Sequence, residues 1–343
     1  MDEADHLMDQ GFDRDIIKIM NMMPDKRQTL LFSATIPPQL KQVMPKALRP
    51  NFKTIDCINE LDSKTETNIQ VPQKYIQLPN MQRFLSGFFE ILNHSIAEAQ
   101  AEGNNHKIIV FFSTAHLTGF MAVLALSIGL DVLQIQSRLS QPKRDRASEK
   151  FRNSKKGILF TSNVSARGVD YPDVTHVIQI GMPDSKAQYV HRIGRTGRAG
   201  KGGKSLLVLF PHENKFLKEV SDFDITPDTQ LTAQMELQPK ASINTKLSLS
   251  LDKISRISEK GGYLGPHDQR VGADLAKSAE ASYKAWLGFY LQQKSRCADT
   301  SKDMIVSRAN DFSAVIGLKK PPPIDKKVIG KMGLRGVKGI NLK

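Results

Sequence analysis

Three arginines and a histidine lie within eight residues, in the run His191-Arg192-Ile193-Gly194-Arg195-Thr196-Gly197-Arg198. A solvated basic helix start could have this composition, but two glycines would weaken such a helix unless another group must approach its backbone closely. Guanidinium groups are planar and permanently charged, so they suit a phosphate chain that develops charge during transfer. The run therefore predicts a site for phosphate chemistry.

Three shorter runs indicate a function only when they are taken together. Asp2-Glu3-Ala4-Asp5 is rich in carboxylates, which the helix dipole favours at any helix start. Ser33-Ala34-Thr35 contains two residue types that commonly cap helices. The segment from Ser165 to Asp170 follows a predicted strand, at the kind of strand-to-loop edge where open α/β sheets bind ligands. Their order along the chain, and no single run, indicates a function.

Taken in this order, the runs resemble the DEAD-box family of ATP-dependent RNA helicases, over residues 1 to about 220. A match of several motifs in sequence is far more specific than a lone motif. The resemblance implies ATP and Mg²⁺ as cofactors and RNA as the partner. It also implies local unwinding of RNA duplexes by two RecA-like domains that ATP and RNA close around each other.

The resemblance assigns roles in nucleotide chemistry residue by residue. Asp2 resembles the acid linked to Mg²⁺ through water, and Glu3 resembles the residue that positions the attacking water. Arg195 and Arg198 resemble the arginine fingers that contact the γ-phosphate. Asp170 resembles the residue that bonds the nucleotide ribose, with Gly168 beside it in the same nucleotide-binding loop. The residues that resemble contacts coupling the two domains are Asp5, Ser33, Thr35, His191 and Arg192.

A second set of positions resembles the family's contacts to the RNA backbone. Such contacts reach phosphates and 2′-hydroxyl groups and carry little sequence information. The set comprises Ser113, Thr114, Gln141, Arg144, Ser162, Arg167 and Gly168.

The chain departs from the family pattern at two pairs of residues. Gln136-Ser137 stands where the family usually has His-Gly, and Ser162-Asn163 stands where it usually has Thr-Asp. Ser162 keeps a hydroxyl, while Asn163 loses a charge and keeps an acceptor. We expect these departures to alter RNA binding or the coupling between domains without abolishing function.

The family's phosphate-binding glycine-rich loop and its adenine-reading motif both precede the DEAD run, and here only Met1 precedes it. Gly203-Lys204-Ser205 imitates the end of such a loop, but Arg198 stands where its first glycine should, and the segment begins a predicted strand. We expect Met1 to be an internal methionine read as a start, in preference to a genuine short form, with the missing half of the first domain supplied upstream. The chain alone is then expected to be inactive in ATP hydrolysis.

Apolar runs alternate with helical patterns from about residue 74 to 220, which predicts an α/β fold: a parallel sheet with helices on both faces. The predicted strands span residues 108–112, 132–135, 157–160, 176–180 and 205–210. With the resemblance, we expect one partial and one complete RecA-like domain plus a mostly α-helical C-terminal extension. The predicted parts are the first-domain remnant 1–60, the linker 61–73, the second domain 74–225 and the basic extension 226–343.

Smaller elements follow from local pattern. Helical spacing predicts a helix from Phe12 to Met23, the run 29–32 predicts a buried strand, and Pro37-Pro38 begins another helix. Residues 221 to about 275 are expected to be mostly loop and weak helix.

The C-terminal part carries an aromatic helix and a basic tail. A helix over about 278–294 is predicted to pack Trp286 and Leu287 on the second domain. Segments 282–290, 307–318 and 330–334 resemble the extension of organellar RNA-chaperone DEAD-box proteins, and more loosely that of nucleolar members. This resemblance places the protein in a mitochondrion or plastid ahead of the nucleolus. The tail near 319–338 would hold RNA loosely and in a salt-dependent way, or would serve only as a soluble surface.

The composition of the chain narrows the class of protein. A formal charge of +14 draws a protein towards polyanions such as nucleic acid. No run of about 18 apolar residues predicts a membrane span, and Cys57 and Cys297 lack metal-ligand spacing, as in an intracellular protein with reduced thiols. The sequence does not identify the protein partners. Two rival functions stay open, a non-enzymatic RNA-binding fragment and a DNA helicase of the wider superfamily.

Overall fold

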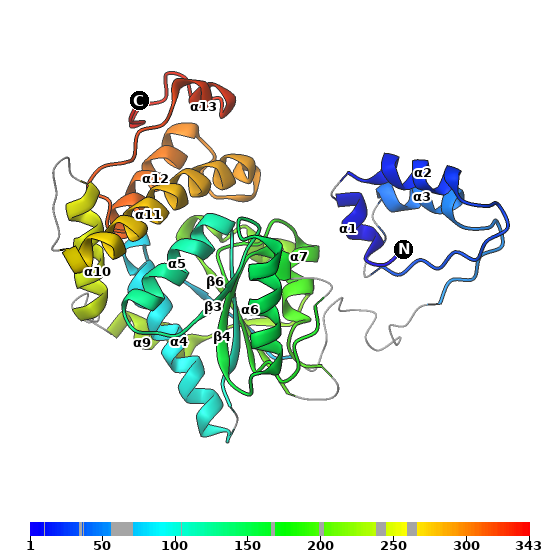
Figure 1. The fold of residues 1–343 in the computed structure, drawn as a ribbon, viewed down its shortest axis with the longest axis horizontal. Helices are drawn as coiled ribbons and strands as arrows, with labels where there is room; N and C mark the ends of the chain where they lie inside the picture. Colours follow the sequence, from blue (N-terminus) through cyan, green and yellow to red (C-terminus); the bar gives the residue numbers. More distant parts are fainter. Residues whose placement is uncertain are drawn as a thin grey trace. The chain divides into compact units, whose positions relative to one another are not determined.

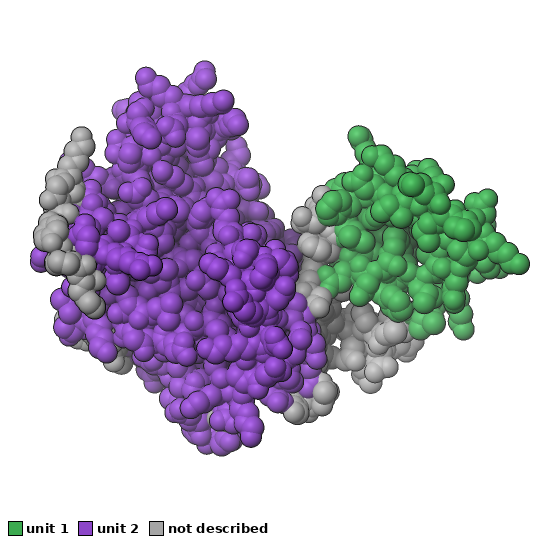
Figure 2. All heavy atoms as spheres, in the orientation of Figure 1, with its two compact units in different colours: residues 1–63 green, residues 64–343 purple. Residues whose placement is uncertain are grey.

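A computed structural model describes residues 1–9, 11–33, 36, 38–55, 71–103, 105–165, 169–198, 202–237, 245–258 and 266–343. The chain divides into two compact units, Met1–Ser63 and Lys64–Lys343, which Figure 2 distinguishes by colour. The predicted boundary between 225 and 226 lies inside the second unit, so the predicted second domain and the C-terminal extension share one compact body.

The first unit is built from three short helices around a small apolar core. They are α1 (Ala4–Asp9), α2 (Asp13–Met22) and α3 (Pro38–Ala47), and the core is formed by Ala4, Met8, Leu40, Val43 and Ala47. The predicted helices at Phe12–Met23 and after Pro37-Pro38 are confirmed as α2 and α3.

The buried strand predicted at 29–32 is wrong. The segment is extended, but Leu30 and Phe32 are 56% and 60% exposed. Three main-chain hydrogen bonds tie it to the chain start, from Met1 N to Leu30 O at 2.7 Å, from Phe32 N to Met1 O at 2.9 Å and from Ala4 N to Phe32 O at 3.0 Å. A strand ladder needs a longer run of paired residues than these bonds form among the described residues of the unit.

The second unit is organised by a seven-stranded sheet in which every pair of neighbouring strands is parallel, as predicted (Figure 1). The spatial order is β3-β4-β2-β5-β6-β1-β7. The strands are β1 (Gln73–Gln77), β2 (Lys107–Phe112), β3 (Leu133–Ile135), β4 (Gly157–Thr161), β5 (His176–Ile180), β6 (Lys204–Leu209) and β7 (Ile225–Pro227). All five predicted strands are present within two residues of their expected bounds, whereas β1 and β7 were not predicted.

Helices cover both faces of this sheet. Along β2, Ile108 and Val110 join the larger core with α4 (Phe84–Ala101) and α5 (Ala115–Ser127), while Ile109 joins a second core with α6 (Gln141–Asn153). This alternation follows from the two-residue period of a strand whose two faces are both buried. The remaining elements of this part are η1 (Met81–Arg83), η2 (Asn163–Ser165), α7 (Lys186–Ile193), η3 (Pro211–Glu213) and α8 (Phe216–Glu219).

The C-terminal part is helical, as predicted, and packs on the sheet domain. It comprises α9 (Thr229–Leu237), α10 (Thr245–Ser258), α11 (Pro266–Gln292), η5 (Lys294–Arg296), α12 (Lys302–Val315) and α13 (Lys326–Lys331). Residues 221–275, expected to be mostly loop and weak helix, contain more helix than that, because α9, α10 and the start of α11 lie in this range and α10 buries Leu247 and Ile254. The helix expected at 278–294 is α11, which begins twelve residues earlier than predicted, at Pro266.

The aromatic face of α11 is buried as expected. Trp286 is 1% exposed and its ring stacks on Phe312 of α12 at a centroid distance of 5.4 Å, with His212 of the sheet domain 5.7 Å away. The basic tail is folded as well. Ile324, Ile329 and Leu334 are buried, and Ile324 pairs with Leu342 in an isolated parallel bridge.

Candidate functional site

The arginine-rich run forms the end of α7 and the turn that follows it. Ser185 caps the start of α7, where its hydroxyl accepts a hydrogen bond from Gln188 N at 3.2 Å. Gly197 has φ +67°, a conformation that favours glycine, and it helps turn the chain towards β6. A Cβ at Gly203 would come within 2.7 Å of Gly197 N, so the two segments approach more closely than any side chain allows. Of the two glycines in the run, Gly197 therefore lies at a close backbone approach to Gly203, whereas a Cβ at Gly194 would come no nearer than 3.5 Å to Val190 O, so a close approach is not found there.

Arg195 and Arg198 both reach the segment that follows β4. The Arg195 side chain is nearly buried, donating from Nε to His191 O at 3.3 Å and from Nη1 to Val169 O. Arg198 donates from Nη1 to the Asp170 carboxylate at 2.5 Å and is about one third exposed. The structure therefore brings together three residues predicted to handle the nucleotide, although Asp170 and Arg198 are 28 positions apart.

Arg192 lies fully buried beneath the carboxyl edge of the sheet. Its Nη2 donates to Asn163 Oδ1 at 2.6 Å, its Nη1 lies 3.5 Å from Gln179 Oε1, and its guanidinium lies over the Phe111 ring at 5.3 Å. Burial lowers the pKa of Arg192 to about 10, against the charge of Asp184, which raises it. Asn163 keeps the acceptor that the sequence analysis expected it to keep.

Three of the residues predicted to contact RNA follow the carboxyl ends of strands. Ser113 and Thr114 follow β2, and Ser162 follows β4. The Thr114 hydroxyl also caps α5, accepting from Leu117 N at 3.1 Å. Because carboxyl ends of parallel strands share one edge, these side chains lie along the same rim. Their contacts with RNA stay predictions.

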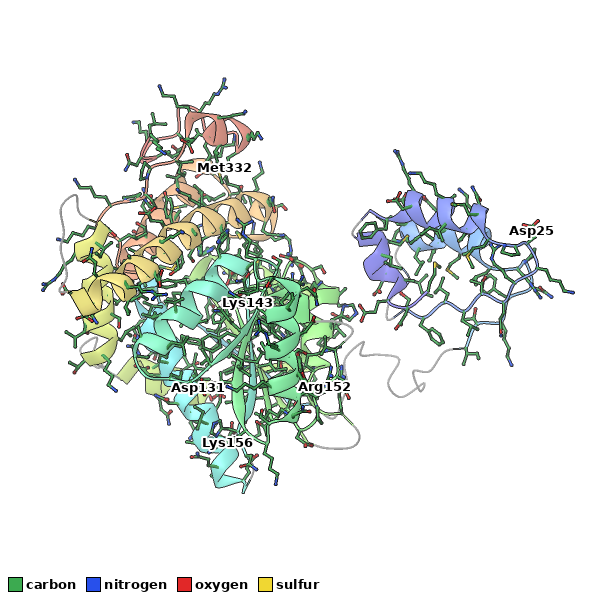
Figure 3. The ribbon with its side chains drawn as sticks, in the orientation of Figure 1. Asp25, Asp131, Lys143, Arg152, Lys156 and Met332 are labelled. Atoms are coloured by element: carbon green, nitrogen blue, oxygen red, sulfur yellow. The ribbon has the colours of Figure 1, made fainter. Side chains whose placement is uncertain are left out.

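Two more predicted RNA contacts lie on α6. Gln141 donates to Asp145 at 2.6 Å, and Arg144 is half-buried. Figure 3 labels Lys143 and Arg152 on the same helix, and Arg152 Nε donates to the Asp170 carbonyl at 3.2 Å. The helix thereby touches the loop that carries the nucleotide residues. Arg167, Gly168 and Thr35 lie outside the described residues.

The acidic run and the serine run meet in the first unit. Asp5 is 2% exposed, and its backbone N donates to Ser33 Oγ at 3.0 Å. Glu3 has φ +48°, an unusual value for a residue with a side chain, and its N donates to Asp2 Oδ1 at 2.9 Å. Ser33 and Asp5, both predicted to couple the two domains, are therefore joined by a hydrogen bond.

The surroundings of Asp2 fit the predicted binding of Mg²⁺ through water by one carboxylate. Asp2 is exposed and offers one carboxylate, and no group of three or more His, Cys, Asp or Glu side chains that could hold a metal occurs among the described residues. A hard cation that keeps most of its waters needs no protein cage of that kind.

Sequence reasoning missed two groups beside these residues. Asp184, in the loop after β5, accepts from Asn163 Nδ2 at 2.5 Å. Glu213 is fully buried, accepting from Met182 N at 2.9 Å, Phe210 N at 2.8 Å and the Tyr290 hydroxyl at 2.5 Å. Burial raises the pKa of Glu213 to about 7. Neither group has a spacing signal, because their partners lie up to 77 residues away.

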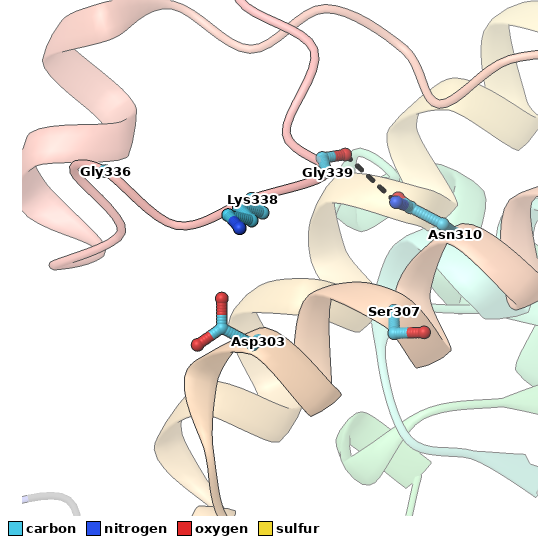
Figure 4. A pocket seen from close by; sticks show the side chains of 6 residues that line it. All are labelled: Asp303, Ser307, Asn310, Gly336, Lys338 and Gly339. Carbon is cyan, nitrogen blue, oxygen red and sulfur yellow. Dashed lines mark hydrogen bonds between the residues drawn. The ribbon is translucent and has the colours of Figure 1, made fainter.

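A separate open pocket of about 580 Å³ lies between α12 and the loop after α13 (Figure 4). Its lining is polar, with Asp303, Ser307 and Asn310 from the helix facing Gly336, Lys338 and Gly339. Asn310 Nδ2 donates to Gly339 O at 2.9 Å, which holds the loop on the helix. This pocket contains none of the predicted site residues.

Comparisons with known proteins point the same way. Residues 1–43 match the family model for the DEAD/DEAH box helicase, and residues 88–200 match that for the helicase conserved C-terminal domain. DEAD-box ATP-dependent RNA helicase 26 of Arabidopsis thaliana is 40% identical over 343 residues, covering 100% of this chain and 36% of the relative. The protein of the same description from Oryza sativa subsp. japonica is 40% identical over 340 residues, covering 99% and 57%. The chain thus spans about a third to somewhat over half of these relatives.

Solved structures show the same fold. Mss116p bound to ssRNA and AMP-PNP matches with a TM-score of 0.71 at 23% identity, covering 100% of this chain and 65% of that one. S. cerevisiae Dbp5 bound to RNA and ADP BeF3 matches with a TM-score of 0.57 at 26% identity, covering 69% and 61%. Among the described helices, none has the length and apolar character of a membrane span. The similarity to these relatives runs along the whole chain and two family models match parts of it, so this chain is similar to the DEAD-box ATP-dependent RNA helicases, of which it spans part of the length.

Proposed function

We propose that this chain is the RNA-binding and arginine-supplying part of an ATP-dependent RNA helicase that separates short RNA duplexes. The observation that carries the proposal is the Arg198–Asp170 ion pair at 2.5 Å, with Arg195 bonded to the same loop at Val169. Guanidinium groups can bind a triphosphate and a carboxylate can bind a ribose, and here these groups lie close together on the second unit.

The chemistry of the individual residues follows from their present contacts. ATP with Mg²⁺ would supply the phosphoryl bond that is cleaved. Arg198 is held by Asp170, so its guanidinium is already oriented when a phosphate competes for it. Arg195 sits nearly buried, where a positive charge acts on a phosphate more strongly than it does in water. Asp5 and Ser33 tie the acidic run to the next predicted motif in the first unit.

The 343-residue chain alone is proposed to hydrolyse no ATP, because its sequence contains no Gly-x-x-x-x-Gly-Lys-Ser/Thr loop to hold the phosphates. The test measures phosphate release by the purified chain, with and without single-stranded RNA. No release above background is expected in either case. RNA-stimulated turnover by the chain alone would contradict this part of the proposal.

A chimera tests the helicase function itself. The segment that precedes the DEAD run in the rice relative, which is 40% identical to this chain, would be joined in frame ahead of Asp2. The chimera is expected to show RNA-stimulated hydrolysis and to separate a short fluorescent RNA duplex. A well-folded chimera that binds ATP and RNA but neither hydrolyses nor unwinds would sink the proposal.

A second candidate function is RNA binding without catalysis, through the second unit and the basic tail. The favouring observation is that the basic residues of the tail are exposed while Ile324, Ile329 and Leu334 are buried; the exposed residues are Lys319, Lys320, Lys326, Lys327, Lys331, Arg335 and Lys338. Fluorescence anisotropy should show the chain binding single-stranded RNA with an affinity that falls steeply with salt. Equal binding to DNA of the same sequence would contradict 2′-hydroxyl recognition and favour the DNA-helicase rival.

We also propose an organellar RNA-chaperone role for the protein. Its support is the resemblance of segments 282–290 and 330–334 to extensions of that type, together with the packing of Trp286 that such an extension would need. Cell fractionation with an antibody against the chain tests the compartment, and a signal confined to the nucleolus would contradict it.

A further inference from the structure

Arg192 is a buried cation whose hydrogen-bond partners are neutral. The guanidinium is fully buried, and a buried cation is costly unless a negative charge compensates it. Among the described residues, the side chain of Arg192 donates to two neutral amides, Asn163 and Gln179. Arg192 Nε and Gln179 Nε2 have no hydrogen-bond partner in the part of the chain that the structure describes. The position of this side chain therefore depends on few bonds.

The compensating carboxylate stands one side chain further away. Asn163 accepts from Arg192 through Oδ1 and donates through Nδ2 to Asp184 Oδ2 at 2.5 Å. The amide dipole is therefore aligned with its negative end on the arginine and its positive end on the carboxylate. Chains of hydrogen bonds polarise one another in this way, so the charge of Asp184 is relayed to Arg192.

The C-terminal extension fixes the backbone that carries this carboxylate. Arg296 donates from Nη1 to Asp184 O at 2.6 Å and to Pro183 O at 3.0 Å. Its Nε and Nη2 form a bidentate pair with Glu219 at 2.8 and 2.7 Å. Fork-to-fork pairs of this kind are strong and geometrically specific. The loop after β5 is thus held from outside while Asp184 points to Asn163.

We propose that Asp184 is a positioning residue, which supplies through Asn163 the negative charge that holds Arg192 in place for coupling between the two helicase domains. The inference rests on the proposed function, because it gives Arg192 its role there. Nothing in the sequence pattern singles out Asp184, which is an exposed residue in a loop. Its importance comes from Asn163, which is neutral and can pass a charge on but cannot provide one.

Moving the charge tests the relay. Asp184→Asn removes the carboxylate, and Asn163→Asp with Asp184→Asn places one carboxylate directly against Arg192. Asp222→Asn is the matched control, because Asp222 pairs with Lys186 on the surface of the same region. Each variant is prepared in the 343-residue chain with isotopically labelled arginine, and Arg192→Lys identifies the guanidinium resonances of Arg192 by their loss.

A held guanidinium gives separate resonances for its two Nη groups, whereas a loose one rotates and gives a single averaged signal. We expect separate Arg192 resonances in the native chain and in Asp222→Asn, an averaged signal in Asp184→Asn, and separate resonances again in the double variant. Unchanged Arg192 resonances in Asp184→Asn would overturn the proposal, as would a folded double variant that fails to restore them.

Two further comparisons keep the test decisive. If Asp184→Asn does not fold, folding of the double variant supports the relay and its failure to fold overturns it. In the chimera, the relay predicts that Asp184→Asn lowers kcat for RNA-stimulated hydrolysis and leaves KM for ATP near its native value, with recovery in the double variant. A chimera without activity, beside resonances that respond as expected, would contradict the proposed function and leave the relay standing.

Discussion

At the scale of single residues, the arginines of the predicted phosphate site already form hydrogen bonds within the second unit. Arg198 pairs with Asp170, and Arg195 bonds to the carbonyl of Val169. A guanidinium that is oriented before its ligand arrives loses less conformational entropy on binding than a free one. The two arginines nevertheless differ, because Arg195 is nearly buried while Arg198 reaches solvent.

This difference predicts how Arg198→Ala behaves. The Arg198–Asp170 pair is largely exposed, so its loss should lower the free energy of unfolding by less than about 1 kcal/mol. In the chimera the same change should lower RNA-stimulated kcat by about 10³-fold or more, the scale of a transition-state arginine. Denaturant unfolding and phosphate release measure the two effects.

Arg256→Ala serves as the control, because Arg256 also forms a largely exposed ion pair, with Asp252 on α10 at 2.7 Å. It should leave both hydrolysis and stability close to native. A drop in stability of several kcal/mol for Arg198→Ala, or an equal loss of hydrolysis in both variants, would show that Arg198 acts through the fold and not on the nucleotide.

At the scale of elements, the C-terminal extension is joined to the sheet domain by buried polar bonds as well as by aromatic packing. Glu213 of η3 accepts the hydroxyl of Tyr290 from α11 and the backbone N of Met182 from the loop after β5. Gly181 has φ +78°, and a Cβ there would lie 3.3 Å from Glu213 Oε1. The carboxyl group is therefore enclosed by three elements at once.

This carboxyl group makes stability depend on pH. Burial raises the pKa of Glu213 from its usual 4.5 to about 7, so the folded state holds the proton more tightly than the unfolded state. Its contribution to stability is fully present below pH 4.5 and is lost as the pH rises through about 7. The loss amounts to roughly 3 kcal/mol if no other group changes.

Neighbouring His212 acts in the opposite sense. Burial lowers its pKa to about 3, so its contribution is present above pH 6.5 and is lost as the pH falls. The useful quantity is therefore the difference in unfolding free energy between the native chain and Glu213→Gln, measured with denaturant from pH 4.5 to 8. The unfolding free energy of the native chain should fall relative to that of Glu213→Gln as the pH rises. Parallel pH profiles for the two proteins would rule the assignment out.

Tyr290→Phe provides a matched variant for the same measurement. The Tyr290 hydroxyl lowers the pKa of Glu213 by donating to its carboxylate, so its removal should raise that pKa further. The loss of stability should then extend to higher pH than in the native chain. If the pH dependence of stability is the same in Tyr290→Phe as in the native chain, the Tyr290 hydroxyl does not lower the pKa of Glu213.

At the scale of the whole molecule, the two units differ greatly in how much apolar surface they bury. The buried core of the first unit consists of Ala4, Met8, Leu40, Val43 and Ala47, while several of its large apolar side chains are exposed. The second unit has cores on both faces of its sheet. Small domains bury too little surface to be strongly stable, so the first unit should be the weaker one.

Hydrogen exchange measures this contrast. Amides of β2 and β5, at the centre of the sheet, should exchange at least about 100-fold more slowly than the helical amides of α3, because they open only when the whole unit unfolds. Amides at the ends of α11 provide an internal reference for fraying within the second unit. Equal protection of α3 and β2 would contradict the predicted difference in stability.

The sequence by itself determined the features that depend on neighbours along the chain. Strands β2, β4 and β5 were predicted because a strand buried on both faces is a continuous apolar run between turn residues. The motif runs were found in the same way, because each lies within a short segment whose residue types reflect one task. The strand predicted at 29–32 failed because its pattern is apolar but its pairing partners are too few.

Only the tertiary structure decided which distant groups share a bond. Arg192, Asn163 and Asp184 come from α7, the end of β4 and the loop after β5, and Glu213 meets Tyr290 across 77 residues. Such contacts depend on where chain segments meet after folding, and hydrogen bonding leaves no periodic trace in the residue order. The burial of Ile324, Ile329 and Leu334 beneath a basic tail is of the same kind, because three separated apolar residues do not predict a fold until the surface that covers them exists.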